Sequence, residues 1–364
     1  MNPLSPIYYI RNNKGRAALI IFMLFFTTLM FMAGNYVASC DWYWEDAIDS
    51  SEKIALVECI PGDEAWSDYH ATLEEMRADS RLHVMERTGY GFGGLSWYCT
   101  IGIEMGSSSF VFNSKEDMEA AAKRLGLSVD LSKVKDHSIV VSKALAKNKG
   151  IHLGDTIDGT VDENLNEEFT VDALIEDDTF ETFFLVHDEK NLVRFYVYSD
   201  EMEGDELYSY IADKIGDRQV KLASRQKHSI NQSLAPLHII MIAGAVLLSV
   251  ILAVTVNSVV TGQYQKRTYE FGVYRALGLS KKTVFRKCAT ELLVMDLIAI
   301  LIGAAIHFLL TFLLNELLYI PNGKYLPYVT DLGLICVAIS NLTVIVPMII
   351  AKGRRMGKAD VTEF

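Results

Sequence analysis

The sequence predicts an α-helical membrane protein with four transmembrane helices and a large α+β extracytoplasmic domain between helices 1 and 2. Half of the 364 residues are apolar and the mean hydropathy is positive, a composition that does not fit an ordinary soluble protein. The apolar residues gather in four long runs. Between the first two runs lies a polar block of about 195 residues, which is long enough to bury its own core.

These patterns divide the chain into nine segments. They are a cytoplasmic amphipathic elbow (1–16), transmembrane helix 1 (17–38), the extracytoplasmic domain (39–234), transmembrane helix 2 (235–261), a cytoplasmic connection (262–288), transmembrane helix 3 (289–318), an outer loop (319–330), transmembrane helix 4 (331–351) and a cytoplasmic tail (352–364).

The first span has 22 residues without a charge, about 33 Å of helix, which matches a hydrocarbon core of about 30 Å. An alternative is a cleaved secretory signal, because Val37 to Cys40 loosely fits the pattern before a lipid-modified cysteine. The apolar run is longer than the roughly 7 to 15 residues of a signal core, which favours a permanent helix.

Basic residues indicate the orientation, because cytoplasmic loops of membrane proteins carry an excess of Lys and Arg. They gather in the amino-terminal arm, in the connection and in the tail, so both termini are predicted to lie in the cytoplasm of a multi-pass protein of the cell membrane. The outer domain has 39 acidic against 19 basic residues, a net charge of −20. That sign disfavours nucleic-acid binding and suits a surface exposed to water.

In the outer domain, helices are expected over 64–79, 115–125, 142–149 and 205–215, and strands over 139–141, 169–175, 183–186 and 194–198. Ser114 can cap the second helix and Gly126 can close it, and Gly150 stops the third. Aromatic belts at the membrane interface are expected at Trp42 to Trp44 and at Tyr319, Tyr325 and Tyr328.

The residues single out no catalytic group, cofactor site or metal site. The glycine-rich stretch 89–94 lacks the Lys-Ser/Thr ending of a phosphate loop and is interpreted as a plain loop or hairpin. Cys40, Cys59 and Cys99 lie outside the membrane, where one disulfide could persist, but the sequence does not choose the pair.

The connection between spans two and three is more structured than a loop that only fixes topology requires. Phe271, Tyr274 and Leu277 recur every three positions, which predicts a short amphipathic helix. Gly278 can end that helix in the left-handed conformation and Ser280 can cap the next one. The segment is therefore predicted to be two helices joined by a hinge.

"YEFGVYRALGLSKKTVFRKCATELLV", Tyr269 to Val294, closely resembles the signature R-E-x-G-x-x-R-A-x-G of FtsX/MacB-type permeases of ABC transporters, with a glutamate, here Glu291, in the helix that follows. Tyr269 stands where the signature has Arg most often. "VVSKALAKNKGIHLGDTIDGTVDENLNEEFTVDALIED", Val140 to Asp177, resembles an outer segment of the same family.

The resemblance implies a permease subunit that is not itself an enzyme and carries no cofactor, with ATP and Mg bound by a separate cytoplasmic ABC ATPase. The family's coupling helix docks on that ATPase, and this partner-binding role falls on Glu270, Phe271, Gly272, Tyr274, Arg275, Ala276, Leu277 and Gly278. Apolar Phe271 and Tyr274 would fill a groove on the partner, with Arg275 making charged contacts.

Three functions are compatible with this reading. In the first, ATP-driven motion is passed to the outer domain (mechanotransmission), and the transporter exports or extracts a peptide, toxin or lipid-linked substrate. In the second, the protein is an FtsX-like regulator that activates an extracellular cell-wall hydrolase. The third, an ATP-independent membrane sensor, needs no coupling helix and is the least favoured.

Four spans do not enclose a pathway alone, so a second permease, identical or different, is expected beside this one within the membrane lipid. Ala243, Gly244, Ala245 and Ser249 are small residues that would allow close helix approach, or would serve ordinary packing. Asp296 and His307 are ionisable at membrane depth. A capped or water-reaching acid is favoured for Asp296 over a proton relay, and the role of His307 is left open.

Overall fold

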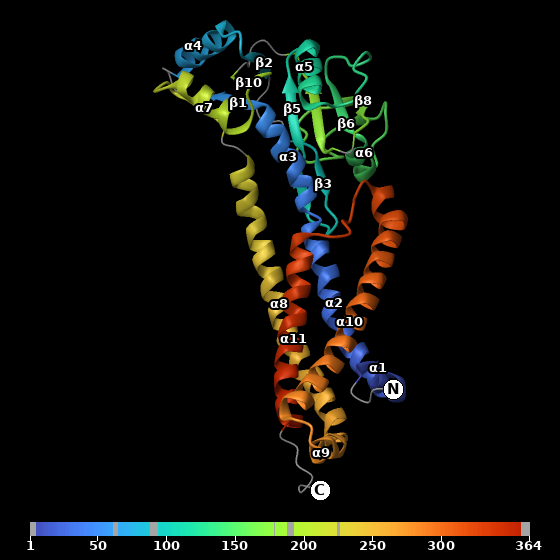
Figure 1. Cartoon of the computed structure of the whole chain (residues 1–364). Helices are drawn as coiled ribbons and strands as arrows, with labels where there is room; N and C mark the ends of the chain where they lie inside the picture. Colours follow the sequence, from blue (N-terminus) through green and yellow to red (C-terminus); the bar gives the residue numbers. More distant parts are fainter. Residues whose placement is uncertain are drawn as a thin grey trace. The chain divides into compact units, whose positions relative to one another are not determined.

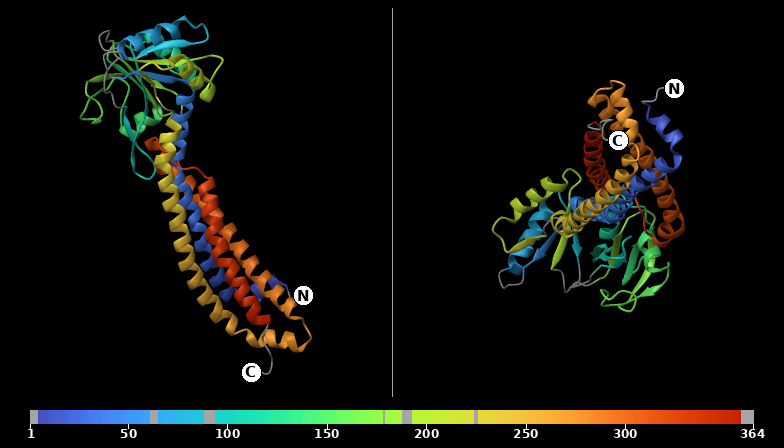
Figure 2. Two further views of the ribbon diagram at one scale, coloured as in Figure 1. Left: turned by 90° about the vertical axis from the view of Figure 1, so that its left-hand side faces the viewer. Right: turned by 90° about the horizontal axis from the view of Figure 1, so that it is seen from below.

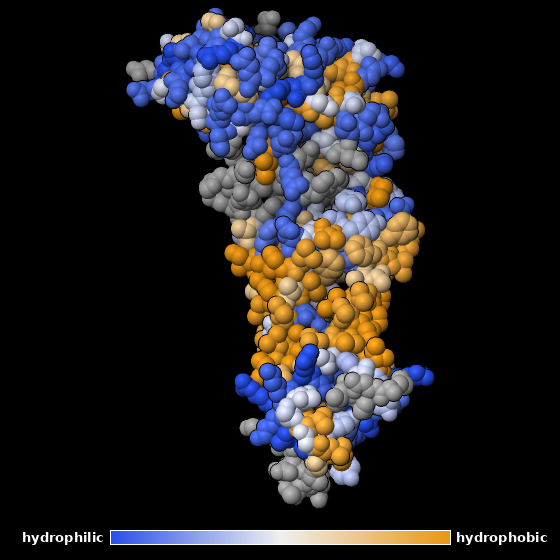
Figure 3. Space-filling view, in the orientation of Figure 1, coloured by the Kyte–Doolittle hydropathy of each residue, from blue (hydrophilic) through white to orange (hydrophobic). Residues whose placement is uncertain are grey.

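The computed structural model describes residues 5–60, 65–87, 94–177, 179–187, 193–223 and 226–357 of the chain (Figure 1). The chain divides into two compact units. The helical unit comprises residues 1–38, 235–314 and 326–364, and the outer unit comprises residues 39–234 and 315–325. On the face seen in Figure 3, hydrophobic residues cover the long helices and hydrophilic residues dominate the outer unit.

Within the described residues, four helices are long and apolar enough to cross a membrane, as predicted. The first two and the last lie in α2 (Lys14–Ala38), α8 (Gln226–Gln265) and α11 (Asp331–Gly357). The third comprises α10 (Lys281–Leu314) and the turns that follow it to Asn322. Of these, α2 is the most buried. Two short helices complete the unit, α1 (Pro6–Asn12) and α9 (Thr268–Ala276). A π-helical turn, η1 (Asn315–Tyr319), and a 3₁₀ turn, η2 (Ile320–Asn322), follow α10.

Small residues let α2 approach its neighbours closely. A Cβ atom added to Gly34 would lie 2.6 Å from the Cα atom of Gly333 in α11. A Cβ atom on Gly303 of α10 would overlap the side chain of Thr28. In a membrane the hydrophobic effect does not drive helices together, because lipid tails are as apolar as the side chains. Close van der Waals packing between helices stabilises their association instead. The packing makes α2 an integral part of the helical unit.

The outer unit contains a four-stranded antiparallel sheet with the order β11-β1-β10-β2. Its strands are β1 (Ala55–Cys59), β2 (His83–Arg87), β10 (Arg194–Tyr198) and β11 (Val220–Leu222). Helices α4 (Ala65–Ala78) and α7 (Gly204–Ile215) pack on it. Tyr69, Phe195 and Leu207 are fully buried in the resulting core.

A second, mixed sheet has the order β5-β9-β6-β8-β7. Its strands are β5 (Ser108–Phe112), β6 (Ser138–Ser142), β7 (Thr156–Ile157), β8 (Phe169–Ile175) and β9 (Glu181–Leu185). Helices α5 (Lys115–Leu125) and α6 (Lys143–Lys149), the hairpin of β3 (Ser96–Tyr98) with β4 (Glu104–Gly106), and α3 (Asp41–Lys53) complete the unit.

The helix caps predicted for the outer domain are confirmed. The Ser114 side chain accepts a hydrogen bond from the Asp117 N–H, and Gly126 closes α5 at φ +76°. Gly150 closes α6 at φ +70°. Strands β8 and β10 have the predicted bounds. The side chains of Trp42 to Trp44 and nearly all of the glycine-rich stretch 89–94 lie outside the described part of the chain.

Candidate functional site

The segment between α8 and α10 is the hinge that the sequence predicts. Figure 2 shows α9 linking these two long helices at the end of the helical unit where the amino terminus also lies. Gly278 adopts φ +90°, which ends α9. The Ser280 side chain accepts a hydrogen bond of 3.1 Å from the Thr283 N–H, which caps α10. The end of α9 and the capped start of α10 therefore form this turn from residues of the chain itself.

Four charged side chains meet beneath α9, and we call Arg267, Glu270, Lys287 and Glu291 the charge cluster. Arg267 contacts Glu291 through Nη1 at 2.8 Å and Glu270 through Nε at 2.9 Å. Lys287 contacts Glu291 at 2.8 Å. The side chains of Arg267, Lys287 and Glu291 are 4%, 3% and 0% exposed. Two positive and two negative charges balance, as buried charges require.

Aromatic rings enclose the guanidinium group of Arg267. The Arg267 Cζ atom lies 4.0 Å from the ring centre of Tyr9 in α1, 4.8 Å from that of Phe271 and 5.2 Å from that of Tyr264. Such cation–π contacts add most where water is excluded. Through Arg267, residues of α1, α8, α9 and α10 meet at one point.

The protonation of the cluster follows from its contacts. Burial alone would raise the pKa of Glu270, but the hydrogen bonds and charge of Arg267, together with the charge of Lys287 and the Tyr274 hydroxyl, hold that pKa below its ordinary value. Burial would lower the pKa of Arg267, yet its two carboxylate partners raise it above its ordinary value. Burial, reinforced by the charge of Glu270, raises the pKa of Tyr274 to about 12. At neutral pH the arginine and Glu270 are therefore charged and Tyr274 is protonated.

The structure corrects one expectation for the predicted partner-binding residues. Phe271 is fully buried in the chain's own core, where its ring stacks at 6.1 Å on Tyr264. It therefore fills no groove on a partner in this conformation. Gly272 is also buried, and Tyr274 is half-buried with its hydroxyl 3.3 Å from Glu270.

The remaining predicted residues lie toward the surface. Arg275 is half-buried and donates a hydrogen bond of 2.6 Å to the Leu279 carbonyl oxygen, so it braces the turn. Ala276, Leu277 and Gly278 are exposed, Leu277 by 73%. Tyr269, which the sequence reasoning left out of the set, is 65% exposed. We call these exposed residues the candidate contact face: Tyr269, Ala276, Leu277 and Gly278.

Sequence reasoning also missed Arg267, Lys287 and Tyr9. The spacing offered a signal, because Arg267 stands three residues before Glu270 and Lys287 stands four before Glu291. Pairs at these separations share one helix face. From the sequence, Arg267 and Lys287 count only among the basic residues of the cytoplasmic connection, since nothing in it brings residues 267 and 291 together.

The other residues singled out in the spans have partners within the helical unit. Ala245 and Ser249 are buried inside the chain, so of the four small residues only Ala243 and Gly244 remain open to a second permease. Asp296 accepts a hydrogen bond of 2.8 Å from the Asn341 side chain, which fits the capped acid that the sequence favoured.

His307 joins an anchor at the far end of α10. Its Nε2 atom lies 2.7 Å from the carbonyl oxygen of Tyr328, to which the Asn35 amide of α2 also donates at 2.7 Å. The Asn35 side-chain oxygen accepts from the Thr330 N–H at 3.1 Å and from its hydroxyl at 2.7 Å. This arrangement gives the histidine a structural role. Across the described ranges, no three His, Cys, Asp or Glu side chains are grouped to hold a metal ion.

The part of the chain that contains this site is similar to a known protein family. Residues 227–355 match the model of the FtsX-like permease C-terminal family. A search of curated proteins finds no match. Among solved structures, the chain is similar to the periplasmic region of MacB from Actinobacillus actinomycetemcomitans, at 11% identity and a TM-score of 0.27, over 50% of this chain and 92% of that one.

A second solved structure is a domain assigned to a permease protein from Porphyromonas gingivalis. It is 10% identical with a TM-score of 0.26, over 48% of this chain and 93% of that one. At these scores neither structure establishes a common fold. The match over residues 227–355 covers α8, α9, α10 and nearly all of α11.

Proposed function

We propose that this chain, which carries an FtsX-like permease C-terminal region, is the permease subunit of an ABC transporter and transmits the motion of a separate cytoplasmic ATPase to its outer unit. ATP and Mg belong to the partner subunit. The substrate is a peptide, toxin or lipid-linked molecule that is exported or extracted. Orientation in the cell membrane follows the basic residues, with α9 and both termini in the cytoplasm.

The charge cluster is the observation that carries this proposal. A helix that only lay on the membrane surface would need no buried ion pairs, whereas α9 is fixed to α1, α8 and α10 through Arg267. Charged side chains that are buried and fully paired hold their neighbours in one geometry. A force applied to the contact face is therefore passed to the transmembrane helices rather than lost by bending of α9.

The same geometry divides the segment into two functional layers. Phe271 and the charge cluster are the inner layer, which transmits. Tyr269 and Leu277 are the outer layer, which docks on the ATPase, because large exposed apolar side chains beside exposed lysines are suited to a protein partner. Substitutions in the outer layer should weaken binding of the ATPase, whereas substitutions in the inner layer should lower the stability of the permease.

The test compares Leu277→Asp with Phe271→Ala in the full-length protein purified from its own membrane. We expect Leu277→Asp to abolish copurification of the ATPase while leaving the unfolding temperature of the permease unchanged. Phe271→Ala should lower the unfolding temperature, because deleting a buried aromatic side chain costs about 3–5 kcal/mol. The matched control is Leu153→Asp, at a leucine 58% exposed in the outer unit.

Retention of the ATPase by Leu277→Asp at the level of Leu153→Asp would refute the docking face. ATP-dependent substrate movement would then separate the remaining functions. If the intact complex hydrolyses ATP without moving any substrate and instead binds a secreted hydrolase, the regulator reading replaces export.

A further inference from the structure

Two cysteines of the outer unit lie in contact although 59 positions separate them in the sequence. Cys40 immediately precedes α3, and Cys99 immediately follows β3. Their Sγ atoms are 3.4 Å apart, and the residues are 2% and 0% exposed. A disulfide bond is about 2.05 Å long, so a small rotation of the two side chains brings the sulfur atoms to bonding distance.

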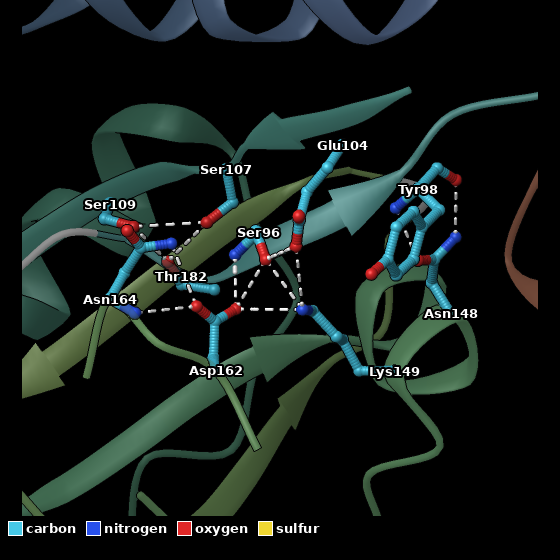
Figure 4. Close-up of polar contacts among 10 residues, drawn as sticks. All are labelled: Ser96, Tyr98, Glu104, Ser107, Ser109, Asn148, Lys149, Asp162, Asn164 and Thr182. Atoms are coloured by element: carbon cyan, nitrogen blue, oxygen red, sulfur yellow. Dashed lines mark hydrogen bonds and ion pairs between the residues drawn. The ribbon is translucent and has the colours of Figure 1, made fainter. Parts of the chain in front are cut away.

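The hairpin that carries Cys99 is held firmly from α6, as Figure 4 shows. The Asn148 side chain accepts a hydrogen bond from the Tyr98 N–H and donates one to the Tyr98 carbonyl oxygen, each at 2.9 Å. At the start of β3, Asp162 accepts from the Ser96 N–H at 2.7 Å and contacts Lys149 at 3.0 Å. Cys99 therefore follows a strand fixed at both ends.

The chain on either side of the sulfur atoms is paired as well. Ser39 and Thr100, the neighbours of the two cysteines, share a side-chain hydrogen bond. Beyond Cys99 the backbone makes a tight turn, in which the Gly102 N–H donates at 2.9 Å to the Cys99 carbonyl oxygen and Gly102 adopts φ +80°. The Ser39–Thr100 contact and the Cys40–Cys99 contact therefore hold residues 39–40 beside residues 99–100.

The two thiols are chemically unequal. The hydrogen bond from the Cys40 thiol, together with N–H groups of Ile101, Ile103 and Gly102, holds the pKa of Cys99 below its ordinary value despite burial. The thiolate is the form of cysteine that attacks a disulfide. Cys99 is accordingly the nucleophile of the pair, and Cys40 resolves the mixed disulfide.

We propose that Cys40 and Cys99 form an intramolecular disulfide in the mature protein. The outward orientation of this unit, which rests on the proposed function, places the pair in a compartment where disulfides persist. Both sulfur atoms are buried, so the reaction takes place during a brief local opening of the outer unit. The Cys99 thiolate then attacks a small-molecule or protein disulfide and expels one thiolate. Cys40 then gives its proton to that thiolate, attacks the Cys99 sulfur and expels the second. The second thiolate takes a proton from water, which balances the proton that Cys99 lost when its thiolate formed. The oxidant leaves as two thiols, and the two cysteines have lost two electrons and two protons.

The third outer cysteine is excluded by its place in the fold. Cys59 ends β1 in the four-stranded sheet, where it pairs with Val220 of β11, and its Sγ atom is 3.6 Å from the Ile60 carbonyl oxygen. The bond selected by the structure closes a loop that contains α3, β1, α4 and β2. It ties the chain two residues beyond α2 to the β3–β4 hairpin.

The experiment uses the full-length protein in membranes, incubated with oxidised glutathione, quenched in acid, and then alkylated with N-ethylmaleimide under denaturing conditions. We expect complete loss of labelling at Cys40 and Cys99, and a cross-linked peptide pair on digestion without reductant. Cys59→Ser should leave this pair unchanged. In Cys40→Ser the cross-linked peptide should disappear, and Cys99 should be recovered as a mixed disulfide with glutathione, which reductant converts back to a thiol that can be labelled.

Full alkylation of both residues after oxidation would overturn the proposal, and so would a peptide that links Cys59 to either one. Stability provides a second readout. Reductant should lower the unfolding temperature of the wild-type protein and leave that of the Cys40→Ser/Cys99→Ser variant unchanged; equal shifts in both would contradict a stabilising bond. ATPase copurification is measured in parallel, so failure of the disulfide is distinguished from failure of the proposed function.

Discussion

Replacing Glu291 tests the charge cluster most directly. Glu291→Gln keeps the size of the side chain and removes its charge, while Arg267 and Lys287, each 2.8 Å from it, stay buried. Within the charge cluster, Glu270 is then the carboxylate that remains beside two cations, and its side chain is 38% exposed. Removing one partner of a buried ion pair costs about 3–5 kcal/mol. We expect the unfolding temperature to fall by several degrees.

The assay is thermal unfolding of the purified full-length protein in one detergent, with two comparisons. Glu316→Gln makes the same change at an exposed glutamate and should shift the free energy of unfolding by no more than about 0.5 kcal/mol. Lys287→Met/Glu291→Leu removes a positive and a negative charge together and leaves the Arg267–Glu270 pair intact. Replacing a buried pair by apolar residues is often neutral, so this double variant should be more stable than Glu291→Gln.

Two results would refute the reasoning. One is an unfolding temperature for Glu291→Gln equal to that of Glu316→Gln, which would mean that the cluster is hydrated and its charges are screened. The other is a double variant less stable than the single one, which would mean that the lost side-chain packing dominates and charge balance does not matter.

Further predictions address pH, the outer unit and helix packing. The folded pKa of Glu270 lies below its ordinary value of 4.5, so its ion pair stabilises the fold above that pH and loses this effect as the pH falls through the folded pKa. The unfolding temperatures of wild type and Glu270→Gln should therefore converge in acid. A constant difference between them at all pH values would contradict this. Asp162→Asn should cost about 3–5 kcal/mol and speed amide hydrogen exchange in β3; unchanged exchange would count against it. Gly34→Ala sets a Cβ atom 2.6 Å from Gly333 and should cost about 1–3 kcal/mol, whereas Gly244→Ala meets nothing within 4 Å; equal shifts would exclude the close contact.

Local chemistry made much of the fold predictable. Ser114, Gly126 and Gly150 act on their nearest neighbours, so the ends of α5 and α6 follow from a few residues. The four spans follow from length and hydropathy alone. The third span is predicted to begin at residue 289, because hydropathy marks only the apolar part of a helix. The helix that contains it begins at Lys281, directly after the predicted Ser280 cap.

What the sequence could not supply was pairing over distance. β1 and β2 are short strands that both pair with β10, but nothing in their sequences identifies β10 as the partner strand. The docking role given to Phe271 failed for the same reason. Its spacing correctly predicts one apolar face of α9, but whether that face meets a partner or the chain's own core depends on Tyr264 and Arg267. Cys40 and Cys99 likewise meet only in the folded chain.

The charge balance beneath α9 has a consequence for the energetics of a membrane under voltage. Moving one elementary charge across a potential of 100 mV changes the energy by about 2.3 kcal/mol. Arg267, Lys287, Glu270 and Glu291 sum to zero, so the charge cluster itself contributes no gating charge when it shifts along the membrane normal. Membrane voltage therefore exerts no net force on the charge cluster, in an energised or in a depolarised cell.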